Sequence, residues 1–261
     1  GTNQRRLPDA TLVSTNWFPD GKRLLTIQRA DRSSPRHLMI MNVDGTESHE
    51  IPVEGVAVSG MPLGDGSSIL VIASQSGADP RTAVLILRVM HLDGSVVRTI
   101  TLPTLPGPVR AMMPSRDGQR LAFVALIRDT TDVSPYATKS STLYTMNIEG
   151  SDLKTVATFT GTVEQPSWSH DDRKIALQHD HPYAHDATGK PLDPDNLDSD
   201  IVVVDVASGA VRDLKHPDRK YLDETPDWSP DGRLYIQSTR DGAMDIYRIK
   251  ADGSKPQRLT K

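Results

Sequence analysis

The chain has no cysteine among its 261 residues, which excludes disulfides, thiolate metal sites and cysteine nucleophiles. It also lacks any run approaching the roughly 18 apolar residues of a membrane span, so we expect no direct membrane insertion. The formal net charge of −4 is small, and binding to nucleic acid needs a basic face. These absences remove thiol chemistry, membrane spanning and nucleic-acid binding from consideration.

Short catalytic signatures are missing as well. The chain contains no Gly-x-Ser-x-Gly elbow, no Gly-x-Gly-x-x-Gly turn, no phosphate-binding loop and no His-Glu-x-x-His pair. The sequence therefore predicts none of the familiar hydrolase, dinucleotide or zinc-peptidase sites.

One five-residue motif, which we call the first-turn phrase, occurs five times in the chain. Trp-Ser-Pro-Asp-Gly stands at 228–232, and altered copies stand at 17–21, 62–66, 114–118 and 168–172. Asp-Gly between apolar segments favours a hairpin, because Gly accepts a positive φ and Asp hydrogen-bonds the turn backbone. We therefore expect each phrase to join the first and second strands of a repeated unit.

A second tight turn follows in each repeat and joins a third strand to a fourth. Its glycines are Gly45, Gly94, Gly150, Gly209 and Gly253. Four short strands per repeat, without helical periodicity, predict an all-β fold, a β-propeller of four-stranded antiparallel blades. A β-sandwich also has many short strands, but it does not explain why the same turn returns every four strands.

The last repeat resembles a known family. Its phrase at 228–232, its Arg-Asp-Gly bend at 240–242 and its Asp-Ile-Tyr strand at 245–247 resemble the TolB-type (WD40-like) β-propeller repeats. The resemblance covers essentially the whole chain and is most specific in the repeats that begin at 17, 168 and 228. It implies a propeller in the bacterial periplasm or at the outer cell surface. The amino-terminal α/β domain of TolB itself is absent from this sequence.

We expect a single propeller domain over residues 1–261, with five repeats visible. Residues 4–8 resemble the fourth strand at 257–260, which leaves open a five-blade ring closed by the amino-terminal segment and a six-bladed ring. In both cases we expect the termini to meet. No signal peptide precedes Gly1, which leaves open a removed targeting segment and a place in a larger membrane-anchored or secreted protein.

Loop lengths direct attention to one face. The interval between the two turns of a repeat varies widely, whereas the interval to the next repeat is nearly constant. The excess lies between second and third strands, at 28–36, 73–82, 128–141 and 179–199. Loops on a rigid scaffold concentrate binding residues, so we predict function at this end of the strands, the long-loop face.

The longest insertion, 179–200, contains three His and six Asp. His179, His181 and His185 fit a set of three nitrogen ligands for zinc or a similar divalent metal, with a position left for water. They fit equally a solvated polar loop whose side chains cap turns. The stretch 193–200 lacks the central Gly and terminal Glu of an EF-hand, although an irregular calcium site stays open.

The connection after the fourth repeat, 216–224, is expected on the same face and mixes charge with an aromatic residue, as protein interfaces do. An ordinary exposed connection is the alternative interpretation. The residues predicted to bind a protein or peptide partner are Tyr136, Tyr183, Arg219, Tyr221, Asp223 and Glu224. By contrast, Trp17, Trp168 and Trp228 share one position of the repeat, where we expect each ring to pack between adjacent blades.

The expected function is that of a non-enzymatic, protein-binding propeller that acts outside the cytoplasm as a scaffold, receptor or sensor domain. One alternative is a metal-assisted polysaccharide lyase or hydrolase that uses the three histidines, as in pectin-degrading propellers with clustered His ligands. Another is the propeller domain of a larger peptidase, since prolyl-oligopeptidase-like enzymes keep their catalytic residues on a separate domain.

Overall fold

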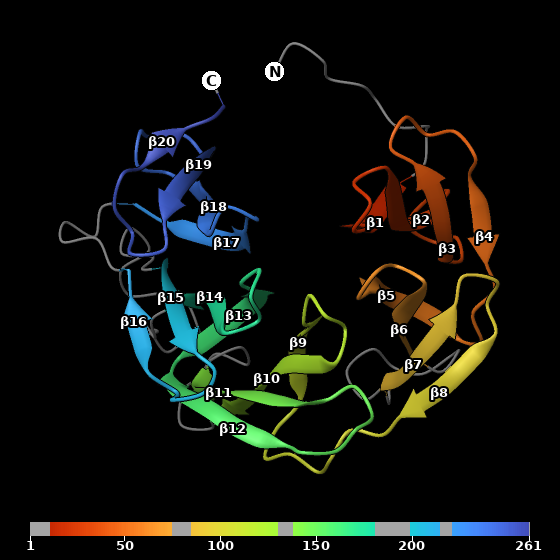
Figure 1. Ribbon diagram of the computed structural model, residues 1–261, viewed down its shortest axis with the longest axis horizontal. Helices are drawn as coiled ribbons and strands as arrows, with labels where there is room; N and C mark the ends of the chain where they lie inside the picture. Colours follow the sequence, from red (N-terminus) through yellow and green to blue (C-terminus); the bar gives the residue numbers. More distant parts are fainter. Residues whose placement is uncertain (1–10, 75–84, 130–137, 181–198, 215–220, 261) are drawn as a thin grey trace. The chain divides into compact units, whose positions relative to one another are not determined.

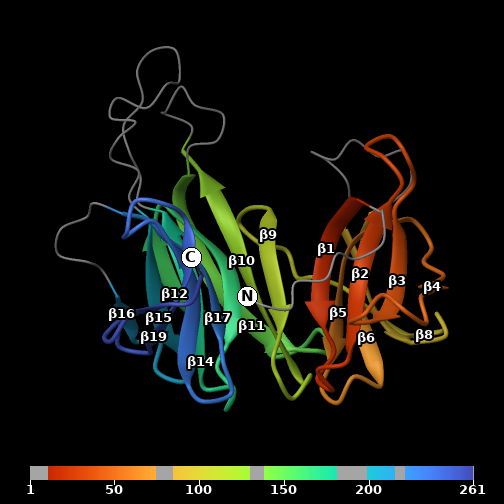
Figure 2. The same cartoon turned by 90° about the horizontal axis from the view of Figure 1, so that it is seen from above.

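A computed structural model of the chain describes residues 11–74, 85–129, 138–180, 199–214 and 221–260. These residues form five four-stranded antiparallel sheets and no helix. In every sheet each strand lies beside the next one along the chain, as Figures 1 and 2 show. The fold is therefore an all-β propeller of five blades, as the repeats predict. Residues 1–8, on which the expectation about ring closure depends, lie outside the described residues.

The contacts divide the chain into two compact units. The first unit, Gly1–Leu102 with Asp117–Gln119 and Ile148–Gly150, holds two blades. Blade 1 consists of β1 (Thr11–Trp17), β2 (Arg23–Arg29), β3 (His37–Asn42) and β4 (His49–Ile51). Blade 2 consists of β5 (Val56–Leu63), β6 (Ser68–Ser74), β7 (Leu85–His91) and β8 (Val96–Ile100).

The second unit, Pro103–Arg116 with Arg120–Asn147 and Ser151–Lys261, holds three blades. Blade 3 consists of β9 (Val109–Pro114), β10 (Arg120–Arg128), β11 (Thr138–Asn147) and β12 (Lys154–Thr160). Blade 4 consists of β13 (Thr162–Trp168), β14 (Lys174–Asp180), β15 (Ser199–Asp205) and β16 (Val211–Asp213). Blade 5 consists of β17 (Asp223–Trp228), β18 (Arg233–Ser238), β19 (Asp245–Lys250) and β20 (Gln257–Arg258).

Tight turns join the first and second strands of every blade at the predicted positions. Gly21, Gly66, Gly118 and Gly232 adopt φ values of +64°, +80°, +71° and +74°, and Asp172 takes the corresponding place in blade 4 at +55°. Only glycine enters this region without strain, and Asp tolerates it better than most residues. The glycines of the second turns also have positive φ. We call this end of the strands the short-turn face.

The aspartate of each phrase stabilises its turn. Asp20 accepts a hydrogen bond from the backbone N–H of Lys22 at 2.8 Å, and Asp65 accepts one from Ser67 at 2.9 Å. Because these bonds favour the ionised carboxylate, they hold the pKa of both aspartates below the usual value. The repeated aspartates therefore serve the fold.

The hydrophobic core lies between neighbouring blades. One cluster joins blades 1 and 2 around Phe18 and Ile69, a second joins blades 3 and 4 around Phe159 and Trp168, and a third joins blades 4 and 5 around Trp228. The second strand of blade 4, β14, is almost wholly buried, because blades 3 and 5 cover both of its faces, whereas β18 of blade 5 has buried residues only at alternate positions. Stability therefore depends on contact between consecutive repeats.

The prediction for the tryptophans is right twice and wrong once. Trp168 and Trp228 are 1% and 6% exposed, and Trp168 Nε1 donates to the carbonyl of Met113 in blade 3 at 3.0 Å. Trp17, however, is 59% exposed, while the next residue, Phe18, is buried. The buried rings pack on the preceding blade, and among the described residues of the first unit no blade precedes β1.

Candidate functional site

Three equivalent positions of the second unit carry charge. Arg110, Glu164 and Glu224 each stand four residues before the first-turn phrase, on the first strands β9, β13 and β17. These strands are neighbours, since β13 contacts both β9 and β17. Together with Asp180, at the end of β14 on the long-loop face, they form what we call the Glu164 cluster.

A register shift interrupts the strand pairing at this position. In blade 4 it lies between Glu164 and Ser167, and in blade 5 between Glu224 and Asp227. Each interval contains a proline, which has no N–H to give to the ladder and so is accommodated at a bulge. Bulges change the direction of neighbouring side chains and are frequent beside functional sites.

The backbone is strained at both bulges. Gln165 and Thr225, which directly follow the two glutamates, adopt φ values of +53° and +50°. A left-handed conformation is unfavourable for side chains with a Cβ, and more so for a β-branched threonine. Strain of this kind persists where the surroundings enforce it, and it clusters at binding and active sites.

Gln178 of β14 connects the blade 5 bulge to Asp180 through its side-chain amide. Its Oε1 accepts a hydrogen bond from the backbone N–H of Thr225 at 3.2 Å, and its Nε2 donates to Asp180 Oδ1 at 2.9 Å. Gln178 also pairs with Glu164 in the ladder and is 8% exposed. One buried side chain therefore holds Asp180 in place and satisfies the irregular backbone of blade 5.

The carboxylates of the cluster disfavour one another's charge. Burial raises the pKa of Glu164, the charge of Asp180 raises it further, and Arg110 acts in the opposite direction. Burial and Asp180 likewise raise the pKa of Glu224. Asp180 thus acts on both glutamates, whereas Arg110 offsets the charge of Glu164 alone, and a cationic group near the two glutamates would favour their ionised forms.

No group of three His, Cys, Asp or Glu side chains within the described ranges converges closely enough to hold a metal ion. The chemistry that these residues offer is recognition of positive charge. Bidentate acceptance from Arg and point-charge contact with Lys are both available to carboxylates in such a setting.

Asp223 and Glu224 begin β17, which contacts β13 and β14 of blade 4, and Tyr221 stands two residues before that strand; their role in partner binding stays a prediction. Asp223 is 7% exposed and accepts two hydrogen bonds from the Arg240 guanidinium, at 3.0 and 2.9 Å. That guanidinium lies 5.0 Å from the centre of the half-buried Tyr221 ring and 4.8 Å from that of Tyr247. The aromatic and the aspartate are therefore held in a fixed geometry at the start of β17, next to Glu224.

His179 is the one predicted metal ligand that the structure describes. It is 9% exposed, its ring lies 5.5 Å from that of Phe159, and its Nε2 donates to the carbonyl of Thr160 at 2.9 Å. In this arrangement Nε2 is committed to the backbone. The remaining predicted residues lie outside the described residues: Tyr136, Tyr183, Arg219, His181 and His185.

The sequence reasoning missed Glu164, Asp180 and Arg110. The signal was present: when the repeats are aligned on their turns, the position four residues upstream reads Val13, Val58, Arg110, Glu164 and Glu224. A position that changes from apolar to charged between repeats, inside an otherwise constant segment, indicates a local role beyond the scaffold.

Antiparallel blades, positive-φ turns at fixed intervals and a core between consecutive sheets define a β-propeller. A sequence model described as the TolB beta propeller domain matches residues 81–261, and the chain belongs to this family. A segment of 62 residues, 23% of the chain, is 42% identical to the uncharacterized protein Atu1656 of Agrobacterium fabrum. That segment represents 20% of the Agrobacterium protein.

Solved structures share the fold at low sequence identity. TolB from Acinetobacter baumannii superimposes with a TM-score of 0.65 at 18% identity, covering 97% of this chain and 55% of that one. An oligogalacturonate lyase in complex with manganese gives 0.64 at 15% identity, covering 97% and 67%. The chain thus spans about half the length of the Acinetobacter TolB chain. The described residues contain no helix that is long and apolar enough to cross a membrane.

Proposed function

We propose that this chain is a non-enzymatic, protein-binding propeller that acts outside the cytoplasm as a scaffold or receptor domain. Its partner presents a basic segment to the Glu164 cluster on the long-loop face. The observation that carries the proposal is the pair of glutamates on the contacting strands β13 and β17, each with a pKa raised by burial and by the charge of Asp180. Membership of the TolB propeller family supports both the binding role and the extracytoplasmic location.

The strained bulges fit this role. A binding site benefits from side chains that are fixed before the partner arrives, because less conformational entropy is then lost on association. Gln178 donates a hydrogen bond to Asp180, and the left-handed residues Gln165 and Thr225 define the backbone direction directly after the two glutamates. Tyr221, held by Arg240, supplies a rigid aromatic neighbour of the kind that interfaces use as an anchor. Tyr136, Tyr183, Arg219 and Asp223 stay predicted parts of the same face.

The test uses a fluorescein-labelled peptide of alternating Lys and Ala and measures its binding by fluorescence polarisation. We expect Glu164→Gln/Glu224→Gln to weaken binding by about tenfold or more, since both substitutions remove a carboxylate that would pair with a lysine of the peptide. The matched control, Glu47→Gln/Glu149→Gln, removes two exposed carboxylates elsewhere and should change binding by less than about twofold.

Equal loss in both double variants would contradict the proposed site. A lyase is tested separately with oligogalacturonate and Mn²⁺, following formation of the unsaturated product. Product that disappears in a His179→Ala variant would overturn the non-enzymatic part of the proposal and favour the histidine-based alternative.

A further inference from the structure

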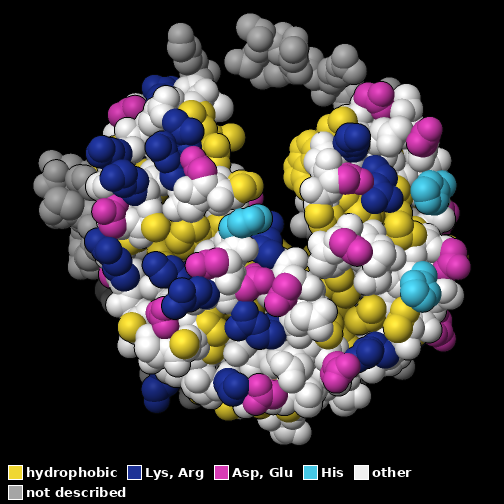
Figure 3. Space-filling model, in the orientation of Figure 1, with side chains coloured by type: hydrophobic (Ala, Val, Ile, Leu, Met, Phe, Trp, Pro, Cys, Tyr) yellow, Lys and Arg dark blue, Asp and Glu magenta, His cyan; other side chains and the backbone are white. Residues whose placement is uncertain are grey.

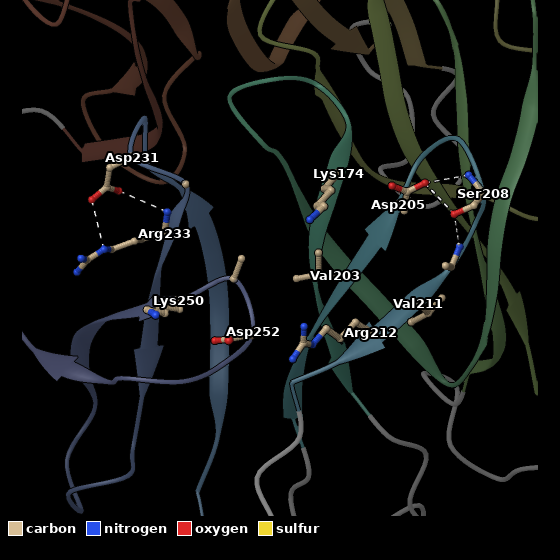
Figure 4. A pocket seen from close by; sticks show the side chains of 13 residues that line it. Lys174, Val203, Asp205, Ser208, Val211, Arg212, Asp231, Arg233, Lys250 and Asp252 are labelled. Carbon is tan, nitrogen blue, oxygen red and sulfur yellow. Dashed lines mark hydrogen bonds and ion pairs between the residues drawn. The ribbon is translucent and has the colours of Figure 1, made fainter.

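A groove of about 680 Å³ lies between blades 4 and 5 on the short-turn face (Figure 4). One wall comes from β14, β15 and β16, and the other from β18, β19 and the turn that follows it. The volume lies within the range of ligand-binding pockets. The groove is at the opposite end of the strands from the Glu164 cluster, so the two sites are independent.

Four basic side chains line the groove: Lys174, Arg212, Arg233 and Lys250. Arg233 lies 3.4 Å from Asp231 in a half-exposed ion pair. Within the part of the chain that the structure describes, Lys174, Arg212 and Lys250 have no ion pair at 4.0 Å or less. Figure 4 shows the ends of Lys174 and Arg212 reaching into the space between the two blades.

The three acidic residues of the groove accept hydrogen bonds from serines in their own turns. Asp205 accepts from Ser208 N and Oγ at 2.9 and 2.7 Å, and Asp252 accepts from Ser254 N and Oγ at 2.9 and 2.6 Å. Asp231 accepts from the Ser229 hydroxyl. One oxygen of each carboxylate is therefore engaged by its own turn, and the hydrogen bonds lower all three pKa values.

Additional positive charge surrounds the groove. Arg173 acts on Asp205, and Arg248 acts on Asp231, in each case lowering the pKa of the carboxyl. Figure 3, in which the short-turn face is toward the reader, shows Lys and Arg side chains gathered over blades 4 and 5. The basic side chains of this region thus outnumber its carboxylates, although the whole chain is acidic.

We propose that this groove binds an extended acidic segment of a protein partner. The cations come from four different strands and are spread over both walls, as Figure 4 shows, an arrangement that suits a chain with carboxylates at intervals better than one compact anion. Between the cations lie Val203, Val211 and Ala251, and Val211 is 46% exposed. An apolar strip flanked by cations suits a peptide that alternates acidic and small apolar side chains.

The probe is a fluorescein-labelled peptide of about eight residues in which Glu and Asp alternate with Ala and Val, measured by fluorescence polarisation near pH 7. Lys174→Gln/Arg212→Gln should weaken its binding by about tenfold or more. The charge-matched control, Lys22→Gln/Lys139→Gln, removes two exposed lysines outside the groove and should change binding by less than about twofold. Circular dichroism spectra of both double variants should match that of the unmodified protein.

Three arms decide the chemistry. The same peptide with Gln and Asn in place of Glu and Asp should not bind. Raising the salt concentration from about 50 to about 200 mM should strongly weaken binding of the acidic peptide. Equal loss in groove and control variants, or equal binding of the neutral peptide, would overturn the proposal. So would a single-stranded oligonucleotide or inorganic phosphate that binds this groove more tightly than the peptide does.

Discussion

Replacing each of the three repeated tryptophans by alanine tests how the blades hold together. The rings occupy one position of the repeat, but Trp168 and Trp228 are 1% and 6% exposed, whereas Trp17 is 59% exposed. Truncating a buried Trp to Ala costs about 3–5 kcal/mol, because the lost transfer free energy adds to that of the cavity. An exposed side chain away from such features changes stability by about 0.5 kcal/mol or less.

The structure also ranks the two buried rings. Trp168 donates to the carbonyl of Met113 and lies under the Arg120 guanidinium at 4.7 Å, whereas Trp228 Nε1 has no hydrogen-bond partner among the described residues. A neutral hydrogen bond contributes about 1 kcal/mol. Trp168→Phe should therefore cost more than Trp228→Phe by about that amount.

Urea unfolding followed by far-UV circular dichroism measures these free energies without relying on tryptophan emission. The expected order of destabilisation is Trp168→Ala, then Trp228→Ala, then Trp17→Ala far behind. Near-native stability of Trp228→Ala would refute the argument that the core lies between blades. A Trp17→Ala variant as unstable as Trp228→Ala would show that its ring is packed in solution.

Other substitutions address charge and backbone. Burial raises the pKa of Glu164, so the folded protein binds its proton more tightly than the unfolded chain does. The resulting stabilisation is complete below the unfolded pKa of about 4.5 and is lost as the pH rises through the folded pKa. Glu164→Gln should therefore raise Tm at pH 7 but not below about pH 4. Asp172→Gly removes the strain of a positive φ, worth about 1–2 kcal/mol, but loses the hydrogen bond from Arg116 N at 2.7 Å, worth about 1.5–3 kcal/mol. Urea unfolding should therefore show a net loss of stability of about 1 kcal/mol. A gain in stability would contradict this balance. Arg240→Met leaves Asp223 buried and uncompensated, which should cost about 3–5 kcal/mol, whereas Arg240→Met/Asp223→Leu should cost clearly less in the same assay.

The fold was predictable because its signals are local and repeated. A turn such as 228–232 needs only Asp and Gly in sequence, and each further copy confirms the period of four strands. The position of Trp17 was not predictable in this way. Its repeat position specifies which face the ring takes, but burial depends on whether a blade lies before it.

The candidate site was harder to predict from the sequence, because differences in loop length direct attention to the variable loops between second and third strands. Glu164 and Glu224 lie in segments whose length is nearly constant between repeats, and there the bulges change side-chain direction without a visible change in the spacing of the turns. The Arg240–Asp223 pair joins residues 17 positions apart, and only the folded blade brings the two charges together. Contacts of that kind leave no periodic trace in a sequence.

The bulge before the first turn has a consequence for how this fold can diversify. A register shift occurs in the first strand of every blade, beside Val13, Val58, Arg110, Glu164 and Glu224. The residue beside the shift is apolar in two blades, cationic in one and anionic in two, so this irregular backbone occurs with all three side-chain types. Each blade therefore has one position, beside this register shift, where a single substitution can change the charge presented to a ligand while the turns and the interblade core keep their structure.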